Sequence, residues 1–231
     1  MIAFILAAGA STRLKPYTLN KHKCLIEVLD NKKIIDIELK NLRDNGVKDV
    51  IITVGHFKEK IETYVKSNYS DMNFIFVNNE KYGSTNCIYS MWLCRKHLNE
   101  DMIFLTGDLI FESKVIKEMI YSKFNNIMYV NPEIKINEKN FKVEIGNNGF
   151  IKEIGVNLFS KNAKMGYPLY KLSKPAMQIW MKEIDNYIQQ DKTNLYGEIA
   201  FNNVADKINL RPMHTTDFCM EIDDHEDLLE A

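Results

Sequence analysis

The sequence lacks the residue pairs and runs that mark metal-bound, disulfide-linked and membrane proteins. Its four cysteines, at positions 24, 87, 94 and 219, form no C-x-x-C pair, and its five histidines form no H-x-x-x-H pair. A zinc ribbon, a redox motif and a disulfide framework are therefore not indicated, and we expect free thiols in a reducing cytoplasm. No apolar run approaches the roughly 20 residues of a membrane span, so we expect no membrane partner.

An excess of one charge is missing as well. Thirty Lys and Arg residues stand against thirty-one Asp and Glu residues, a formal net charge of −1. This balance gives no broad positive field, so we expect no nucleic-acid partner and look only for local positive patches. The 231 residues contain no internal repeat, low-complexity tract or Pro/Gly/Ser linker. We therefore expect one domain over 1–231, as a monomer or a homodimer.

The first half of the chain alternates between apolar runs and amphipathic segments. Residues 1–10 are apolar and end in small residues, as a signal peptide does, but no basic region precedes them. We expect strands over 3–7, 25–28, 50–54, 73–77, 102–105 and 126–130. We expect helices over 34–45 and 57–67, from a cap at Ser84 or Thr85 to 98, and after a cap at Ser113. This order predicts an α/β fold with a mixed, mainly parallel, Rossmann-like sheet and helices on both faces.

The second half changes character. Two short strands, 142–145 and 150–154, flank a Gly-Asn-Asn-Gly turn and predict a hairpin, and 167–172 predicts a further strand. Ser173 with Pro175 predicts a helix start, and that helix reaches about 189. Helical spacing returns over 195–206 and 224–229. We expect this half to form a small lobe.

Residues of low β propensity follow four of the expected strands. They are the loop 8–13, Gly55-His56, Asn78-Asn79 leading to 84–86, and Gly107-Asp108. Ligands bind beyond the carboxyl ends of the strands in an open parallel sheet, so these residues predict a site at that edge. In the loop 8–13, small side chains let backbone N–H groups approach a ligand, and Arg13 and nearby lysines suit a triphosphate.

Residues 6–18 read L-A-A-G-A-S-T-R-L-K-P-Y-T, and Lys23 and Leu25 follow them. This stretch resembles the opening signature of the sugar-phosphate nucleotidyltransferase (nucleoside-diphosphate pyrophosphorylase) superfamily, although His22 stands where a proline usually precedes the lysine. The resemblance implies a GT-A-like fold in which Arg13 and Lys23 are catalytic and hold and polarise the phosphates. It also implies a nucleotide-binding loop made of Leu6, Ala7, Ala8, Gly9, Ala10 and Ser11.

Two acidic segments extend the resemblance. Leu105-Thr106-Gly107-Asp108 resembles the family element whose aspartate binds Mg²⁺, with Gly107 against the nucleotide. Glu221-Ile222-Asp223 resembles the segment that carries the second metal-binding aspartate, although Asp224 is a rival for that role. Two carboxylates together with phosphate oxygens suit Mg²⁺. The resemblance therefore implies Mg²⁺ as cofactor, held by Asp108 and Asp223.

Within the superfamily, the chain most resembles the small cytidylyltransferases that act on phosphocholine or aminoethylphosphonate. Residues 77–82 and the run Tyr196-Gly197-Glu198 carry this resemblance. It implies CTP as the nucleotide, bound also by Asn78, Ser84, Thr85 and Asn86 in a nucleotide-binding half over 1–130. It implies an acceptor-binding lobe over 131–231, in which we expect acceptor contacts from Glu144, Tyr170, Tyr196 and Glu198.

The expected reaction transfers CMP to a small phosphorylated or phosphonate metabolite, such as phosphocholine, phosphoethanolamine, aminoethylphosphonate or an amino-acid phosphate, and releases pyrophosphate. One alternative is a sugar-1-phosphate nucleotidyltransferase that uses UTP, dTTP or GTP. Its Glu-Lys-Pro motif is absent, and Gly155-Val156-Asn157 stands there. A second alternative is a non-catalytic nucleotide-binding regulatory protein, which would be expected to have lost signature residues.

Overall fold

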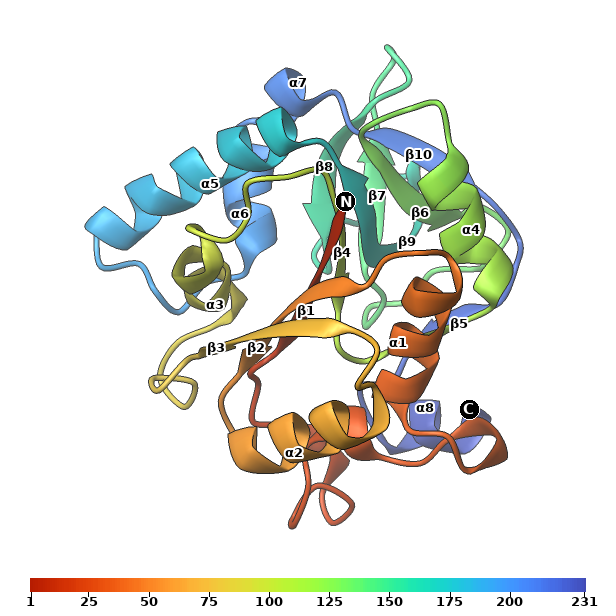
Figure 1. Ribbon diagram of the computed structural model, residues 1–231. Coiled ribbons are helices and arrows are strands. Elements are labelled where there is room, and N and C mark those ends of the chain that lie inside the picture. The colour runs from red at the N-terminus through yellow and green to blue at the C-terminus, as the bar shows by residue number, and fades with distance from the viewer.

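One mixed β-sheet runs through the centre of the molecule, which a computed structural model describes over residues 1–231 apart from the side chain of Asp30 (Figure 1). Its main path runs through β10 (Arg211–His214), β6 (Ile127–Asn131), β9 (Ala163–Leu172), β4 (Met102–Thr106), β1 (Ile2–Ala7), β2 (Asp49–Val54) and β3 (Asn73–Asn78). Neighbouring strands are parallel except where β9 pairs antiparallel with β4 and β6. The expected mainly parallel, Rossmann-like sheet is confirmed.

The remaining strands of the described chain form two smaller groups. β7 (Lys142–Ile145) and β8 (Ile151–Gly155) form the expected antiparallel hairpin, and β7 also pairs with β9. β5 (Leu109–Phe111) pairs antiparallel with β11 (Cys219–Glu221). The sequence pattern predicted neither β5, β10 nor β11, because strands of three or four residues are too short to show a period. The β5–β11 pair brings the end of the chain back to Asp108.

Helices cover both faces of the sheet, as expected. On one face lie α1 (Ile34–Asp44), α2 (Lys58–Asn68) and α4 (Ser113–Tyr121), whose apolar residues share a core with the sheet. On the other face, α3 (Cys87–Cys94), α5 (Lys174–Gln189), α6 (Gly197–Asn202) and α7 (Ala205–Ile208) group together in Figure 1 and share a second core. The last helix, α8 (His225–Glu230), lies beside the N-terminal loops, where the His225 ring Nε2 is 2.5 Å from the Lys15 carbonyl oxygen.

The centre of the second core is aromatic. Trp180 of α5 is 1% exposed and packs against the rings of Phe104, Tyr170 and Phe201 at centroid distances of 5.2 to 5.9 Å. Its indole N–H donates to the Gly197 carbonyl oxygen at 2.9 Å. Trp180 is therefore a core residue that ties α5 to the start of α6, and its faces are not open to a ligand.

Several local predictions were wrong. Residues 25–28 form no strand of the sheet: a 3-10 helix spans Lys23–Leu25, and Glu27 makes only an isolated bridge to Lys33. Leu25 and Ile26 are buried because the segment packs beneath α1, which gives it a strand-like composition without a strand partner. The pattern over 195–206 breaks into α6 and α7, with Val204 between them in a non-helical conformation.

Two helix caps also differ from expectation. Asn86, not Ser84 or Thr85, caps α3, because its side chain accepts from the Cys87 N–H at 2.7 Å. This helix ends at Cys94 rather than at 98. Ser113 is the first residue of α4 and not its cap. By contrast, the Ser173 hydroxyl accepts from the Ala176 N–H at 3.3 Å, so the predicted start of α5 is confirmed.

None of the described helices is long and apolar enough to cross a membrane.

Candidate active site

The residues predicted to form a site follow four strands that lie next to one another. β4, β1, β2 and β3 are consecutive in the sheet and parallel, so their carboxyl ends share one edge. The loop 8–13 follows β1, Gly55 follows β2, Asn79 follows β3 and Gly107-Asp108 follows β4. The structure therefore brings the predicted loops together at the edge where ligands bind in this class of sheet.

The loop 8–13 presents backbone donors. Ser11 adopts a left-handed conformation with φ of 54°, and within the described chain the N–H groups of residues 9–13 have no hydrogen-bond acceptor. The Ser11 hydroxyl oxygen is buried and also has no partner there, whereas its carbonyl accepts from the Thr18 hydroxyl at 2.8 Å. A run of free N–H groups around a left-handed residue can bind an anion.

Two glycines allow the loops of this edge to pack closely. A β-carbon on Gly55 would lie 2.7 Å from the Ala8 carbonyl oxygen and 2.9 Å from Tyr82 Cβ. A β-carbon on Gly107 would lie 3.0 Å from Ala7 Cβ and 3.1 Å from the Leu6 carbonyl oxygen. The Gly55 position therefore requires glycine for the first loop to sit against its neighbours, and Gly107 leaves little room for a side chain.

A lysine joins the two predicted metal-binding aspartates. The Lys23 ammonium lies 2.5 Å from Asp108 Oδ2 and 3.0 Å from Asp223 Oδ1, and the Arg13 guanidinium lies 2.9 Å from the same Asp223 oxygen. The Lys23 and Asp108 side chains are largely buried, at 17% and 12% exposure, whereas that of Arg13 is 67% exposed. Four predicted residues from the beginning, middle and end of the chain thus form one cluster.

The charges of this cluster act on one another. Burial opposes the charge of Lys23, but the carboxylates of Asp108 and Asp223 outweigh it and raise the pKa of Lys23. Burial likewise opposes the charge of Asp223, but Lys23 and Arg13 outweigh it and lower the pKa of that carboxyl group. Both groups are therefore charged at neutral pH.

Two further carboxyl groups lie beside the cluster, and the sequence analysis gave neither a role. Burial, and then the charges of Asp108 and Asp223, raise the pKa of Glu221. Burial, and then the charge of Asp108, raise the pKa of Glu38, a fully buried residue of α1 whose Oε1 accepts from the Leu109 N–H at 3.1 Å. A signal for Glu38 was present, because it shares the buried helix face of Ile34 and Leu42 at a spacing of four residues.

The predicted cation site has the oxygen ligands that Mg²⁺ prefers but not a full set of them. Asp108 Oδ1 is buried and has no hydrogen-bond partner in the described chain. No group of three or more His, Cys, Asp and Glu side chains among the described residues could hold a metal ion alone. Mg²⁺ commonly binds to one or two carboxylates and completes its shell with waters and substrate phosphates. Asp108 and Asp223 therefore fit a magnesium site that a bound phosphate completes.

A second group of unpaired polar atoms belongs to residues within 131–231, the expected acceptor lobe. The Tyr170 hydroxyl and Glu198 Oε2 are buried without partners in the described chain. Burial, and then Glu198 and Glu221, raise the pKa of Tyr170, so these two carboxyl groups lie near that hydroxyl. Neither carboxyl group forms a salt bridge in the described chain. The charge of Lys23 acts on Glu221 from a distance and offsets part of the rise in its pKa. Burial raises the pKa of both carboxyl groups, and a cation bound beside them would favour their charged form.

Other predicted contact residues are already engaged in the protein. Glu144 pairs with Lys152 at 2.8 Å, and Tyr196 is 59% exposed at the start of α6. The Ser84 and Thr85 hydroxyls both donate to the Lys81 carbonyl, and the Asn86 side chain is the cap of α3. Asn78 ends β3 at the site edge. The side chains of Glu144, Ser84, Thr85 and Asn86 therefore already have partners in the protein, and the exposed side chain of Tyr196 is only loosely held. Asn78 is the exception.

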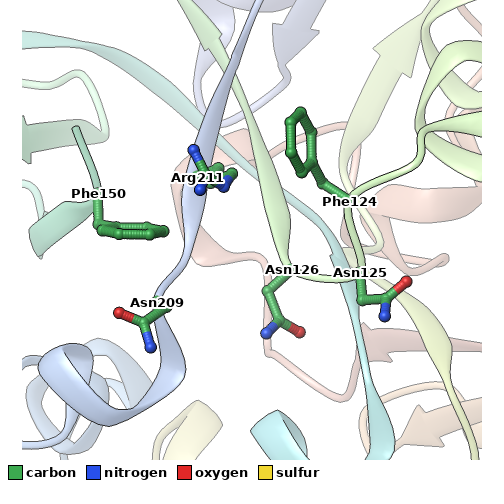
Figure 2. A pocket seen from close by; sticks show the side chains of 6 residues that line it. All are labelled: Phe124, Asn125, Asn126, Phe150, Asn209 and Arg211. Atoms are coloured by element: carbon green, nitrogen blue, oxygen red, sulfur yellow. The ribbon is translucent and has the colours of Figure 1, made fainter.

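A pocket of about 310 Å³ lies at the opposite edge of the sheet (Figure 2). There the Arg211 side chain lies between the rings of Phe124 and Phe150, with its guanidinium carbon 4.7 and 4.5 Å from their centroids. Arg211 begins β10 and is level with Ile127 at the start of β6, so the pocket is at the amino ends of these strands. None of the residues predicted for the site lines this pocket.

Glu38→Gln tests the charge beneath Asp108. Folding raises the pKa of Glu38 above its ordinary value of 4.5. At pH values above 4.5 the folded chain therefore keeps a proton on Glu38 that the unfolded chain has lost. The free energy of unfolding of the native chain should therefore fall as pH rises above 4.5, by at most about 1.4 kcal/mol per pH unit from this group. We expect urea denaturation to show Glu38→Gln gaining stability relative to the native chain as pH rises.

The matched control is Glu59→Gln, an exposed glutamate of α2. A stability difference between the native chain and Glu38→Gln that stays constant from pH 5 to pH 8 would show that Glu38 carries its charge in the folded state.

Comparisons with known proteins agree with this architecture. Residues 2–143 match the family model described as nucleotidyl transferase. The chain is 32% identical over 127 residues to choline-phosphate cytidylyltransferase of Streptococcus pneumoniae (strain ATCC BAA-255 / R6), which covers 55% of this chain and 53% of that protein. It is 30% identical over 129 residues to CTP:phosphoglutamine cytidylyltransferase of Campylobacter jejuni, with coverages of 53% and 49%. The match thus spans about half the length of these curated relatives.

A solved structure of CTP:phosphocholine cytidylyltransferase from Streptococcus pneumoniae has the same fold. It superposes with a TM-score of 0.79 over 99% of this chain and 96% of that chain. The sequence identity of this superposition is 22%, so it is evidence for the fold alone. The family match covers more than half of the 231 residues, and the chain belongs to the nucleotidyl transferase family.

Proposed function

We propose that the chain transfers CMP from CTP to a small phosphorylated or phosphonate metabolite that carries an amine, and releases pyrophosphate. The observation that carries this proposal is the cluster of Lys23, Arg13, Asp108 and Asp223 beside a loop of free N–H groups. The same residues argue against a non-catalytic regulatory protein, because no signature side chain of the cluster is missing. The relatives named as choline-phosphate and phosphoglutamine cytidylyltransferases support CTP as the nucleotide.

The proposed chemistry asks the protein mainly to hold charges in place. An oxygen of the acceptor phosphate attacks the α-phosphorus of CTP in line, a P–O–P bond forms, and the bond to the pyrophosphate leaving group breaks. The attacking oxygen is already an anion, so no general base is needed. Lys23 and Arg13 hold the phosphate oxygens and offset their charge, while the N–H groups of residues 9–13 orient them.

Asp108 and Asp223 are the proposed Mg²⁺ ligands. One oxygen of Asp108 is buried without a partner, and both side chains lie against the cations proposed to hold the phosphates, Lys23 and Arg13. Bound there, Mg²⁺ supplies a Lewis acid that polarises phosphate oxygens. In the structure Lys23 lies between the two carboxylates. Lys23 would then turn from the carboxylates toward the phosphates when the nucleotide binds.

The acceptor is proposed to bind with its amine toward Glu198, Glu221 and Tyr170. These two carboxyl groups form no salt bridge among the described residues, and the Tyr170 hydroxyl, on which both act, has no partner. A sugar 1-phosphate would leave the carboxyl groups without a cation.

The four cysteines are free in the structure, which suits a reducing compartment such as the cytoplasm.

Substitution of the two aspartates tests the proposed metal site. Asp108→Asn and Asp223→Asn keep the side-chain size but remove an anionic ligand, so each should lower pyrophosphate release about 100-fold or more. Asp224→Asn is the matched control, because Asp224 caps α8 and asparagine is an equally good cap. Full activity in EDTA, or loss of activity in Asp224→Asn alone, would contradict the proposed ligands.

Gly9→Val tests the phosphate loop. A β-carbon at Gly9 meets no protein atom within 4 Å, so the fold should tolerate the change. The larger side chain would occupy the space in which a phosphate approaches the backbone, and CTP should bind at least about 10-fold more weakly. Calorimetric titration of Mg²⁺-CTP measures this, and a thermal melt checks the fold. Unchanged affinity for CTP would place the phosphates elsewhere.

An acceptor competition tests the amine. With CTP, we expect phosphocholine, phosphoethanolamine, aminoethylphosphonate or an amino-acid phosphate to be used in preference to glucose 1-phosphate. Glu198→Gln should reduce that preference about 30-fold, since an ammonium desolvated against a carboxylate gains about 2 kcal/mol. Preference for glucose 1-phosphate would favour the sugar-nucleotide alternative. Equal use of UTP, GTP or ATP would contradict the assignment of CTP.

A further inference from the structure

His22 lies between the phosphate loop and the catalytic lysine. The residue is 1% exposed. Its ring Nε2 is 2.9 Å from the Gly9 carbonyl oxygen, and its ring Nδ1 is 3.2 Å from the Cys24 backbone nitrogen. One side chain thus contacts both segments of the family signature, although the signature itself has a proline at this position.

The two partners allow one protonation state of the ring. The Gly9 carbonyl can only accept a hydrogen bond, so Nε2 must carry a proton and donate. The Cys24 N–H can only donate, so Nδ1 must be unprotonated and accept. A doubly protonated ring would place two donors against each other at Cys24. Burial, followed by the charge of Lys23 and more weakly that of His56, lowers the pKa of His22 to about 3, so the ring stays neutral.

The bridge also explains how the loop presents its donors. The Gly9 carbonyl faces His22 and the Ser11 carbonyl faces the Thr18 hydroxyl, so these two acceptors of the loop are held by the protein. The N–H groups of residues 9–13 have no such partners in the described chain. On the other side of the ring, the bond to Cys24 fixes the start of the 3-10 helix that begins at Lys23.

We propose that His22 is a positioning residue that, as the neutral ring protonated on Nε2, fixes the phosphate-binding loop 8–13 relative to Lys23. It touches no reacting atom and acts through Gly9 and through the turn that carries Lys23. The consequence for nucleotide binding rests on the proposed function, whereas the bridge itself is a property of the chain without ligand. A buried histidine that served only to fill the core would affect stability but would not need this tautomer.

Two substitutions separate the halves of the bridge. In His22→Asn, the side-chain oxygen can take the place of Nδ1 and accept from Cys24, but no group reaches Gly9. In His22→Gln, the side-chain amide can take the place of Nε2 and donate to Gly9. We expect calorimetric titration with Mg²⁺-CTP to show about 10-fold weaker binding in His22→Asn, the scale of one hydrogen bond, and at most about 3-fold in His22→Gln. His97→Gln, at an exposed histidine, is the matched control and should bind normally.

Three readouts decide the proposal. In steady-state assays, the KM for CTP should rise in His22→Asn more than kcat falls, and urea denaturation should show similar stability for the two His22 variants. Nitrogen-15 NMR of the native chain without nucleotide should show His22 protonated on Nε2 alone, with no titration between pH 5 and pH 9. Equal binding losses in both variants, losses that follow stability, or a ring that titrates in this range would overturn the proposal.

These readouts are separable from the proposed reaction. If the native chain binds Mg²⁺-CTP and shows the bridged ring but releases no pyrophosphate with any acceptor, the proposed function fails and the positioning role stands. If it turns over CTP normally while His22→Asn and His22→Gln bind CTP as the native chain does, the positioning role fails and the proposed function stands.

Discussion

The ammonium of Lys23 is the interaction on which the arrangement of this edge depends. It joins a residue near the start of the chain to Asp108 in the middle and Asp223 near the end, at 2.5 and 3.0 Å. Removing one partner of such a largely buried group would leave a charge without compensation, which is far more costly than losing a surface ion pair. The β5–β11 pair and the 2.9 Å bond from the Ile222 N–H to the Asp108 carbonyl hold the chain end in place.

Carboxyl groups outnumber cations around that ammonium. Asp108, Asp223, Glu221 and Glu38 surround Lys23, and Arg13 adds one exposed cation. Burial, followed by the charge of Asp108, raises the pKa of both glutamates, and a cation bound beside them would favour their charged form. A divalent cation that binds with the nucleotide would reduce the repulsion among these carboxyl groups. An ammonium group on the acceptor would do the same. The acidic residues thus account for both the proposed cofactor and the proposed acceptor chemistry.

The parts of the structure that the sequence predicted are those set by local pattern. Apolar runs marked β1, β2, β3, β4 and β6, and the residues that follow the first four of them meet at one edge because parallel strands end together. The role of Glu221 depends on the β5–β11 pairing, which joins residues more than 100 positions apart and leaves no periodic trace. The hydroxyls of Ser84 and Thr85 were expected to contact the nucleotide or to cap α3, but their own turn uses them. Composition alone does not distinguish a side chain that serves its loop from one that serves a ligand.

The signature loop shows why small residues and a buried histidine occur together. Small side chains leave the backbone exposed, but an exposed backbone presents carbonyls as well as N–H groups, and carbonyls repel phosphate. His22 and Thr18 engage two of those carbonyls from the protein side, whereas the N–H groups of residues 9–13 have no partner in the described chain. Donors fixed before the ligand arrives need no reorganisation when charge develops on a phosphate. A proline would stiffen the turn but would offer neither a donor to Gly9 nor an acceptor to Cys24, whereas a neutral imidazole supplies both from one ring.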